Sequence, residues 1–172
     1  MIPTTILTTA LAATAFAAPL CCDPCTATQP VLTARVSSRS NDFINAGCAP
    51  IIMIFARGST EDGNMGTVCG PQTGQALKDI FGAANVAVQG VEYLASISTN
   101  FLPGGADPAG VAEMQLLISL AVAECPASKL VVGGYSQGAA LTHRALESMK
   151  ALDRDHVVAA FLYGDTQFAQ VG

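Results

Sequence analysis

Short apolar runs alternate with amphipathic segments along this chain, which is the pattern of strands alternating with helices. Four runs have the length and composition of buried strands, at residues 51–56, 86–90, 130–132 and 157–163. Helical spacing of apolar residues follows between them, at residues 72–81, 108–124 and from 136 onward. This order predicts an α/β fold, a three-layer α/β/α sandwich around a central, mostly parallel sheet.

The ends of these elements are marked by specific residues. Asp107 can cap a helix with Pro108 at its first position, and Pro126 ends that helix. In the last helix, apolar residues recur at helical spacing as far as residue 152: Leu141, Ala145, Met149 and Leu152. Residues 97–107 contain Pro103-Gly104-Gly105 and are expected to form a loop.

The first 18 residues are typical of a secretory signal. Residues 6–18 are apolar, and Ala15-Phe16-Ala17 offers small residues before a cleavage site. The run is shorter than the ~20 residues that span a membrane, so we expect no transmembrane span and a secreted, extracellular product. Residues 19–40 are a polar lead-in with a cysteine cluster, and residues 41–172 form one domain.

Six cysteines indicate an oxidising compartment. Cys21, Cys22 and Cys25 cluster near the start, whereas Cys48, Cys69 and Cys125 are spread along the chain, and counting alone does not pair them. Cys22 and Cys25 form a Cys-x-x-Cys, which could indicate redox or zinc chemistry. No second such pair exists and the two histidines are isolated, so we expect neither a metal nor another cofactor.

Composition narrows the possible partners. The chain is 51% hydrophobic and 12% charged, which excludes a disordered protein. Its net charge is −5 and it has no basic run, so we expect neither nucleic acid nor an anionic membrane as a partner. We expect a monomer.

A candidate nucleophile lies between the third strand and the helix that follows it. Gly134-Tyr135-Ser136-Gln137-Gly138 is a G-x-S-x-G, and a strand before it with a helix after it is the setting of a nucleophile elbow. The glycines allow the strand and the helix to approach closely, and the helix N-terminus favours negative charge near Ser136. The alternative is a glycine-rich turn in which Ser136 only caps the helix.

Acyl transfer also needs donors for an oxyanion. The backbone N–H of Gln137 is one candidate. Ser59 is the other, because its turn follows strand 51–56 at the sheet edge where Ser136 lies. A plain turn serine is the alternative for Ser59. For Arg57, a salt bridge that holds the turn is favoured over a carboxylate-binding role.

Four motifs together resemble the fungal cutinase family. They occur in the family's order and at similar spacing between about residues 41 and 166: Phe55-Ala56-Arg57-Gly58-Ser59-Thr60-Glu61, Gly63-Asn64-Met65-Gly66, Gln89-Gly90-Val91 and Gly133-Gly134-Tyr135-Ser136-Gln137-Gly138-Ala139-Ala140. Cutinases are small secreted serine esterases with the α/β-hydrolase fold, which cleave the plant polyester cutin.

The resemblance implies roles for individual residues. Ser136 would be the nucleophile, Ser59 and Gln137 the oxyanion hole, and Cys48 and Cys125 a disulfide. Both cysteines precede strands, so a parallel sheet places them at one edge, away from Ser136. Residues 92–106 would border the site, with these candidate substrate contacts, for which ordinary core positions are the alternative: Leu94, Ile97, Phe101 and Leu102.

The chain departs from the family in two ways. The cysteine cluster and Cys69 are not part of the recognised pattern. A catalytic acid and base should follow the nucleophile in that order, yet only His143 and His156 are present. His143 is seven residues along the helix from Ser136, and His156 precedes its strand, so neither should reach Ser136.

These departures lead to an expectation about the chain as a whole. Asp165 is a possible but disfavoured substitute acid, so the acid and base are expected to be absent and the chain to be a cutinase truncated at its C-terminus. Residues 157–163 would then be an exposed apolar edge. Two other functions remain open: an esterase of the same fold acting on acetylxylan or lipid, and a secreted, non-catalytic binding protein. The absence of tryptophan mildly disfavours stacking on sugar rings.

Overall fold

The structure is a computed structural model that describes residues 35–168. The expected signal at residues 1–18 and the cysteines at positions 21, 22 and 25 lie outside the described residues. Within residues 35–168, no helix combines the length and the apolar character that crossing a membrane requires.

Twelve elements follow one another in the described chain. They are α1 (Asp42–Ala46), β1 (Ile51–Ala56), α2 (Gly70–Phe81), η1 (Ala83–Asn85), β2 (Val86–Gly90), η2 (Ile97–Phe101), η3 (Pro103–Gly105), α3 (Pro108–Glu124), β3 (Lys129–Tyr135), α4 (Gln137–Ser148), α5 (Ala151–Arg154) and β4 (Val157–Tyr163). The η elements are 3₁₀ helices. All four predicted strands are confirmed, although β3 continues beyond the predicted residues 130–132 as far as Tyr135.

The strands form one parallel sheet in the order β2-β1-β3-β4. Ala56 of β1 pairs with Gly134 of β3, and Tyr135 pairs with Tyr163 of β4. The carboxyl ends of all four strands therefore meet at one edge. This edge carries the segments that follow β1, β3 and β4, which include Ser59, Ser136 and Asp165.

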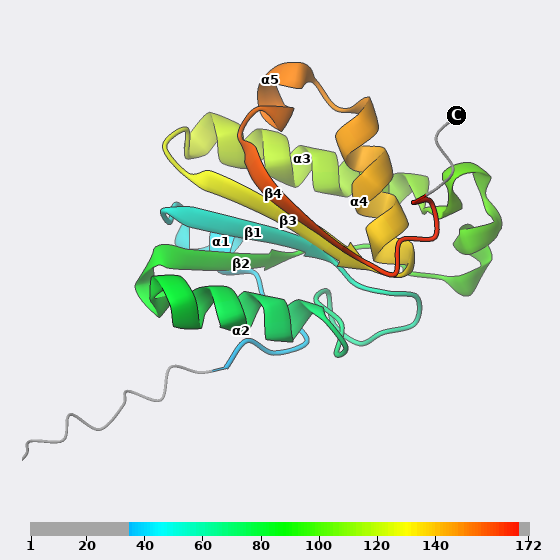
Figure 1. Ribbon diagram of the computed structural model, residues 1–172, viewed down its shortest axis with the longest axis horizontal. Coiled ribbons are helices and arrows are strands. Elements are labelled where there is room, and N and C mark those ends of the chain that lie inside the picture. Colours follow the sequence, from blue (N-terminus) through cyan, green and yellow to red (C-terminus); the bar gives the residue numbers. More distant parts are fainter. Residues whose placement is uncertain (1–34, 169–172) are drawn as a thin grey trace, which may run out of the picture. The chain divides into compact units, whose positions relative to one another are not determined.

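Alternating side chains of β1 separate the core into two parts, one on each face of the sheet. Ile52 and Ile54 pack with residues of α3 and α4. Met53 and Phe55 point the other way and pack with Leu77 of α2. Figure 1 shows α3 and α4 on one side of the sheet and α2 on the other. The predicted three-layer α/β/α sandwich is confirmed.

α3 begins and ends where the sequence indicates. The Asp107 carboxylate accepts a hydrogen bond from the Ala109 N–H at 3.0 Å, and Pro108 occupies the first helical position, where its missing N–H is not needed. The helix ends at Glu124, two residues before Pro126.

The prediction of one helix from residue 136 to residue 152 is wrong. α4 ends at Ser148, where the hydroxyl bonds to the Arg144 carbonyl, and Met149 adopts an extended backbone. Met149 is buried in the core, whereas Leu152 lies in the separate helix α5 and is 79% exposed. Packing of Met149 therefore ends the helix, and the helical spacing of Leu152 is coincidental.

Residues 97–107 are more ordered than the predicted loop. η2 and η3 are held by turn hydrogen bonds from Leu102 N–H to the Thr99 carbonyl and from Gly105 N–H to the Leu102 carbonyl. The Ser96 hydroxyl caps η2 by accepting from the Ser98 N–H. The proline and the two glycines thus shape short 3₁₀ turns instead of preventing helical structure.

β4 is one of the two edge strands of the described sheet. Within the described residues it pairs only with β3. Val158, Phe161 and Tyr163 are each more than a third exposed, as the sequence led us to expect for an apolar edge. Such an edge offers backbone groups to another strand, so it favours self-association.

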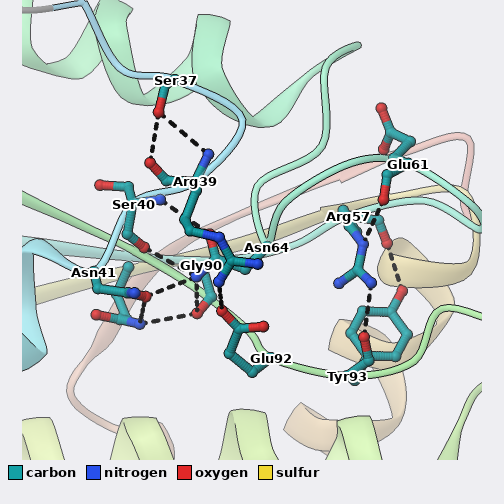
Figure 2. A network of polar contacts seen from close by, with 11 residues as sticks. Ser37, Arg39, Ser40, Asn41, Arg57, Glu61, Asn64, Gly90, Glu92 and Tyr93 are labelled. Carbon is teal, nitrogen blue, oxygen red and sulfur yellow. Dashed lines mark hydrogen bonds and ion pairs between the residues drawn. The ribbon is translucent and has the colours of Figure 1, made fainter.

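The described part of the lead-in, residues 35–40, contacts the domain through polar groups. The Val36 N–H donates to the Gln75 side chain, and the Ser40 hydroxyl donates to the Val88 carbonyl. Asn64, which is fully buried, accepts from the Ser40 N–H and donates to the Asn41 side chain. Figure 2 shows this network next to Gly90.

The disulfide between Cys48 and Cys125 is present, as the family resemblance implied. Their Cα atoms are 5.5 Å apart and 77 positions separate them in sequence. Cys48 precedes β1 and Cys125 follows α3, so the bridge lies at the amino edge of the sheet, opposite Ser136. Cys69 is unpaired within the described residues.

We expect loss of this disulfide to destabilise the fold strongly. Because it closes a long loop, replacing both cysteines (Cys48→Ser with Cys125→Ser) should lower the free energy of unfolding by about 4 kcal/mol in the chain-entropy model. Urea denaturation under non-reducing conditions measures this loss, with Cys69→Ser as the control. A double variant as stable as the unsubstituted chain would contradict the prediction.

An acidic side chain joins α1 to β2 and to α2. Asp42 accepts hydrogen bonds from the Lys78 ammonium at 2.7 Å and from the Val88 N–H at 3.2 Å. Burial disfavours the charged carboxylate, but the bonds from Lys78 and Val88 outweigh it and lower the pKa of Asp42. The folded chain therefore holds this proton less readily than the unfolded chain does.

This difference predicts a pH-dependent contribution to stability. A lowered pKa stabilises the fold above the unfolded pKa, and the effect is lost as the pH falls through the folded pKa. Because Asp42 is partly exposed, Asp42→Asn should cost only about 1 kcal/mol at neutral pH, and the cost should shrink below about pH 4. Urea denaturation at several pH values measures this, with the exposed Asp155→Asn as control; a cost independent of pH would contradict the explanation.

Candidate functional site

Ser136 occupies a strained turn between β3 and α4. Its backbone has φ 54° and ψ −117°, which a residue with a side chain rarely adopts, at a cost of about 1–3 kcal/mol. The Ser136 N–H donates to the Tyr163 carbonyl of β4 at 2.8 Å, and the Ala139 N–H donates to the Ser136 carbonyl at 2.9 Å. The turn is therefore held from both sides.

The two glycines of the motif leave no room for a side chain. A Cβ at Gly134 would lie 2.1 Å from the carbonyl oxygen of Gly138. A Cβ at Gly138 would lie 2.1 Å from the carbonyl oxygen of Ala56 in β1. Both contacts are with backbone atoms, which cannot move aside, so the predicted steric role of the glycines is confirmed.

The environment of Ser136 disfavours the capping alternative. Ser136 stands at the N-cap position of α4, but its side chain makes no capping hydrogen bond. A strained serine without a capping bond gives nothing to helix stability through its hydroxyl. The hydroxyl instead lies at a helix N-terminus, where unpaired N–H groups favour negative charge.

Ser59 and Gln137 are joined through Asn100. The Asn100 amide donates to the Ser59 hydroxyl oxygen at 2.9 Å, and its carbonyl oxygen accepts from the Gln137 amide at 3.0 Å. Asn100 lies in η2, so this 3₁₀ helix bridges the turn after β1 and the start of α4. Sequence reasoning did not single out Asn100, because one asparagine in a predicted loop carries no signal of such a contact.

The Gln137 side chain connects η2 to the start of α4, next to Ser136. The side chain is fully buried, and the amide also donates to the Ser96 carbonyl at 2.8 Å and lies 2.7 Å from the Thr99 hydroxyl. As the first residue of α4, Gln137 has a backbone N–H without an acceptor inside the helix. The Gln137 side chain is thus used in hydrogen bonds to η2, whereas its backbone N–H has no partner inside α4 and can donate to another group.

Arg57 holds its turn in a different way from the predicted salt bridge. Its guanidinium donates to the carbonyl oxygens of Glu61 at 2.8 Å and of Tyr93 at 2.7 Å, and it lies over the Tyr93 ring. The Tyr93 hydroxyl donates in turn to the Arg57 carbonyl, as Figure 2 shows. Burial raises the pKa of Tyr93, so its hydroxyl remains a donor.

Apolar side chains near this edge are exposed. The four residues that the resemblance offered as substrate contacts are each at least 41% exposed: Leu94, Ile97, Phe101 and Leu102. They are therefore not core residues, which was the alternative. Their exposure leaves them free to contact an apolar ligand.

Both nitrogen atoms of His143 are engaged by carboxylates. Nδ1 lies 2.8 Å from Asp165 and Nε2 lies 3.1 Å from Glu147. Asp165, which follows β4, also accepts from the Gln167 N–H. Asp165 and His143 are thus hydrogen-bonded to each other, and no hydrogen bond within residues 35–168 joins either side chain to Ser136.

His156 lies at the other edge of the sheet. Its carbonyl accepts from the Leu130 N–H at the beginning of β3, whereas Ser136 follows the end of β3. The described residues also include no group of three or more His, Cys, Asp or Glu side chains that could hold a metal ion.

Comparison with curated proteins identifies close relatives. A Cutinase family model matches residues 47–171. Cutinase CUT2 of Pyricularia oryzae is 46% identical over 145 residues, which cover 83% of this chain and 68% of that protein. Probable cutinase 5 of Aspergillus terreus is 40% identical over 96% of this chain and 73% of its own length.

Solved structures of similar fold include a cutinase. A Trichoderma reesei cutinase in complex with a phosphonate inhibitor superimposes with a TM-score of 0.68 and 33% identity, over 78% of this chain. The chain spans 58% of the length of that structure. An acetyl xylan esterase, at 20% identity and a TM-score of 0.55, shares the fold. On its motifs, its fold and these comparisons, the chain belongs to the cutinase family.

Proposed function

We propose that the chain carries the nucleophile and the oxyanion hole of a secreted, cutinase-type carboxylic-ester hydrolase. The observation that supports this best is the bridge through Asn100, which connects Ser59 with Gln137, the neighbour of the strained Ser136. In this proposal Ser136 attacks an ester carbonyl, the alcohol leaves, and water releases the acid from the acyl-enzyme.

The contacts of Ser59 suit the role of oxyanion donor. Its oxygen accepts a hydrogen bond from Asn100, so its own hydroxyl hydrogen remains available to a further acceptor. Together with the backbone N–H of Gln137, it offers donors to the oxygen that becomes negative in the tetrahedral intermediate. Asn100 and the Gln137 side chain fix these groups before substrate binds.

We further propose that these 172 residues do not supply the general base. His143 is held between Asp165 and Glu147, and His156 lies at the opposite sheet edge. The relatives are longer than this chain, which spans 68% and 73% of the two described above. Ser136 would then depend on a base from elsewhere, so the 172-residue chain should turn over esters poorly.

The exposed apolar residues favour an aliphatic substrate such as cutin over acetylated xylan. Leu94 and Ile97 would contact an acyl chain, and the absence of tryptophan mildly disfavours stacking on sugar rings. A lipid ester satisfies the same contacts and remains the second candidate. A non-catalytic binding protein would have no need for the strained Ser136.

Added imidazole tests the nucleophile and the missing base together. The 172-residue chain should hydrolyse p-nitrophenyl butyrate slowly, with residual catalysis from the oxyanion hole alone of about 10³–10⁴ over water. Imidazole should increase the enzyme-dependent rate beyond its own catalysis. Ser136→Ala should abolish this increase, and Ser59→Ala should reduce it by about 10²–10³.

Other outcomes separate the alternatives. Rapid hydrolysis that is lost in His143→Ala or His156→Ala would show that the chain contains its base. No reaction of Ser136 with an organophosphonate, even with imidazole, would favour a binding protein. If imidazole-dependent release of acetate from acetylated xylan is faster than hydrolysis of p-nitrophenyl butyrate, the acetylxylan alternative is favoured. If long-chain esters are cleaved faster than p-nitrophenyl butyrate, a lipid substrate is favoured.

Secretion has its own test. The small residues Ala15, Ala17 and Ala18 predict cleavage after Ala17 or Ala18. N-terminal sequencing of protein from the culture fluid of an expressing fungus should therefore begin at residue 18 or 19. Extracellular protein that retains Met1 would contradict the prediction.

A further inference from the structure

Glu61 stands out because its carboxylate receives more hydrogen bonds than any role assigned so far requires. One oxygen accepts from the Gly58 N–H at 2.6 Å. The other accepts from the Thr67 N–H at 2.8 Å and the Val68 N–H at 2.9 Å, and contacts the Thr67 hydroxyl at 3.4 Å. These donors belong to two segments, the turn around Ser59 and the approach to α2.

Two glycines lie close to the carboxylate. A Cβ at Gly66 would lie 2.4 Å from a Glu61 oxygen, and one at Gly58 would lie 3.1 Å from the same oxygen. The absence of side chains at Gly58 and Gly66 therefore lets the carboxylate come close to the backbone of both segments. This makes Glu61 a fixed part of the turn and not a mobile surface residue.

The turn that Glu61 holds is strained. Residues 57–61, which we name the oxyanion loop, contain Thr60 at φ 62°. The Thr60 N–H bonds to the carbonyl of Ala95, which also has a positive φ of 52°. Such conformations persist only where surrounding contacts hold them. Arg57 supports one end of the loop, and the Glu61 carboxylate supports the N–H immediately before Ser59.

We propose that Glu61 is the positioning residue of the oxyanion loop: its carboxylate fixes Gly58 and thereby aligns Ser59 with Asn100. This inference rests on the proposed function, in which Ser59 donates to the oxyanion. Glu61 does not exchange a proton with substrate. It acts through the geometry of Ser59, which a catalytic hydrogen bond needs to have correct to within a fraction of an ångström.

Glu61→Gln is the sharpest variant, because both carboxylate oxygens are approached only by donors. An amide must present its NH₂ either to the Gly58 N–H, which loses one hydrogen bond, or to the Thr67 and Val68 N–H groups, which loses two. The orientation that loses the bond to Gly58 is therefore favoured. Glu92→Gln makes the same chemical change at an exposed carboxylate whose partner is Arg39. It serves as the matched control.

Nuclear magnetic resonance on the ¹⁵N-labelled 172-residue chain tests the geometry without requiring activity. In Glu61→Gln, hydrogen exchange of the Gly58 amide should accelerate about tenfold, and the side-chain amide signal of Asn100 should shift because Ser59 moves. Glu92→Gln should leave both unchanged. Faster exchange at Gly58 with an unshifted Asn100 signal would show that Glu61 does not align Ser59 with Asn100, and would overturn the proposal.

A second variant covers the case in which Glu61→Gln does not fold. Glu61→Asp keeps the carboxylate but shortens the side chain by one methylene, which should weaken the hydrogen bond to the Gly58 N–H. The Asn100 side-chain signal should then shift together with faster exchange of the Gly58 amide. Faster exchange at Gly58 without a shift of the Asn100 signal would overturn the proposal.

Kinetics then test whether the effect passes through Ser59. With imidazole present, Glu61→Gln should lower the Ser136-dependent kcat on p-nitrophenyl butyrate about tenfold with little change in KM. In a Ser59→Ala background the further loss should fall below about threefold; a full tenfold loss there would overturn the proposal. If the unsubstituted chain shows no Ser136-dependent hydrolysis, the proposed function fails, and the resonance measurements alone decide the role of Glu61.

Discussion

The close approach of three backbone segments around Ser136 is the constraint on which the rest of this structure depends. Gly134 of β3 touches Gly138 of α4, and Gly138 touches the end of β1 at Ala56. No side chain fits between them, so β1, β3 and α4 have one possible arrangement. That arrangement brings the turn after β1 to the start of α4, and the bridge through Asn100 then becomes possible.

Features that depend on local sequence could be predicted. β1 and β4 are continuous apolar runs, and Asp107-Pro108 and Pro126 mark the ends of α3. Parallel pairing then places every loop that follows a strand at one edge, which is why Ser59 and Ser136 could be assigned to the same edge. The family resemblance added the disulfide, because spacing alone does not pair six cysteines.

Features that depend on contacts between distant residues could not be predicted. The end of α4 is set by the packing of Met149 in the core, and periodicity along the helix cannot report this. Asn100 binds Ser59, which is 41 residues away in the sequence, and Gln137, which is 37 residues away. Arg57 was expected to pair with a carboxylate but donates to the carbonyl oxygens of Glu61 and Tyr93, and the second of these lies 36 residues away in the sequence.

The bond between the Ser136 N–H and the Tyr163 carbonyl has a consequence for biosynthesis. The ribosome completes β1, β3 and α4 before it makes β4, so the strained turn at Ser136 lacks one of its supports while the chain is still growing. The turn gains this hydrogen bond only after β4 has docked on β3. If Ser136 is the nucleophile, as proposed, the order of synthesis therefore completes its support late, when most of the described domain has already been made.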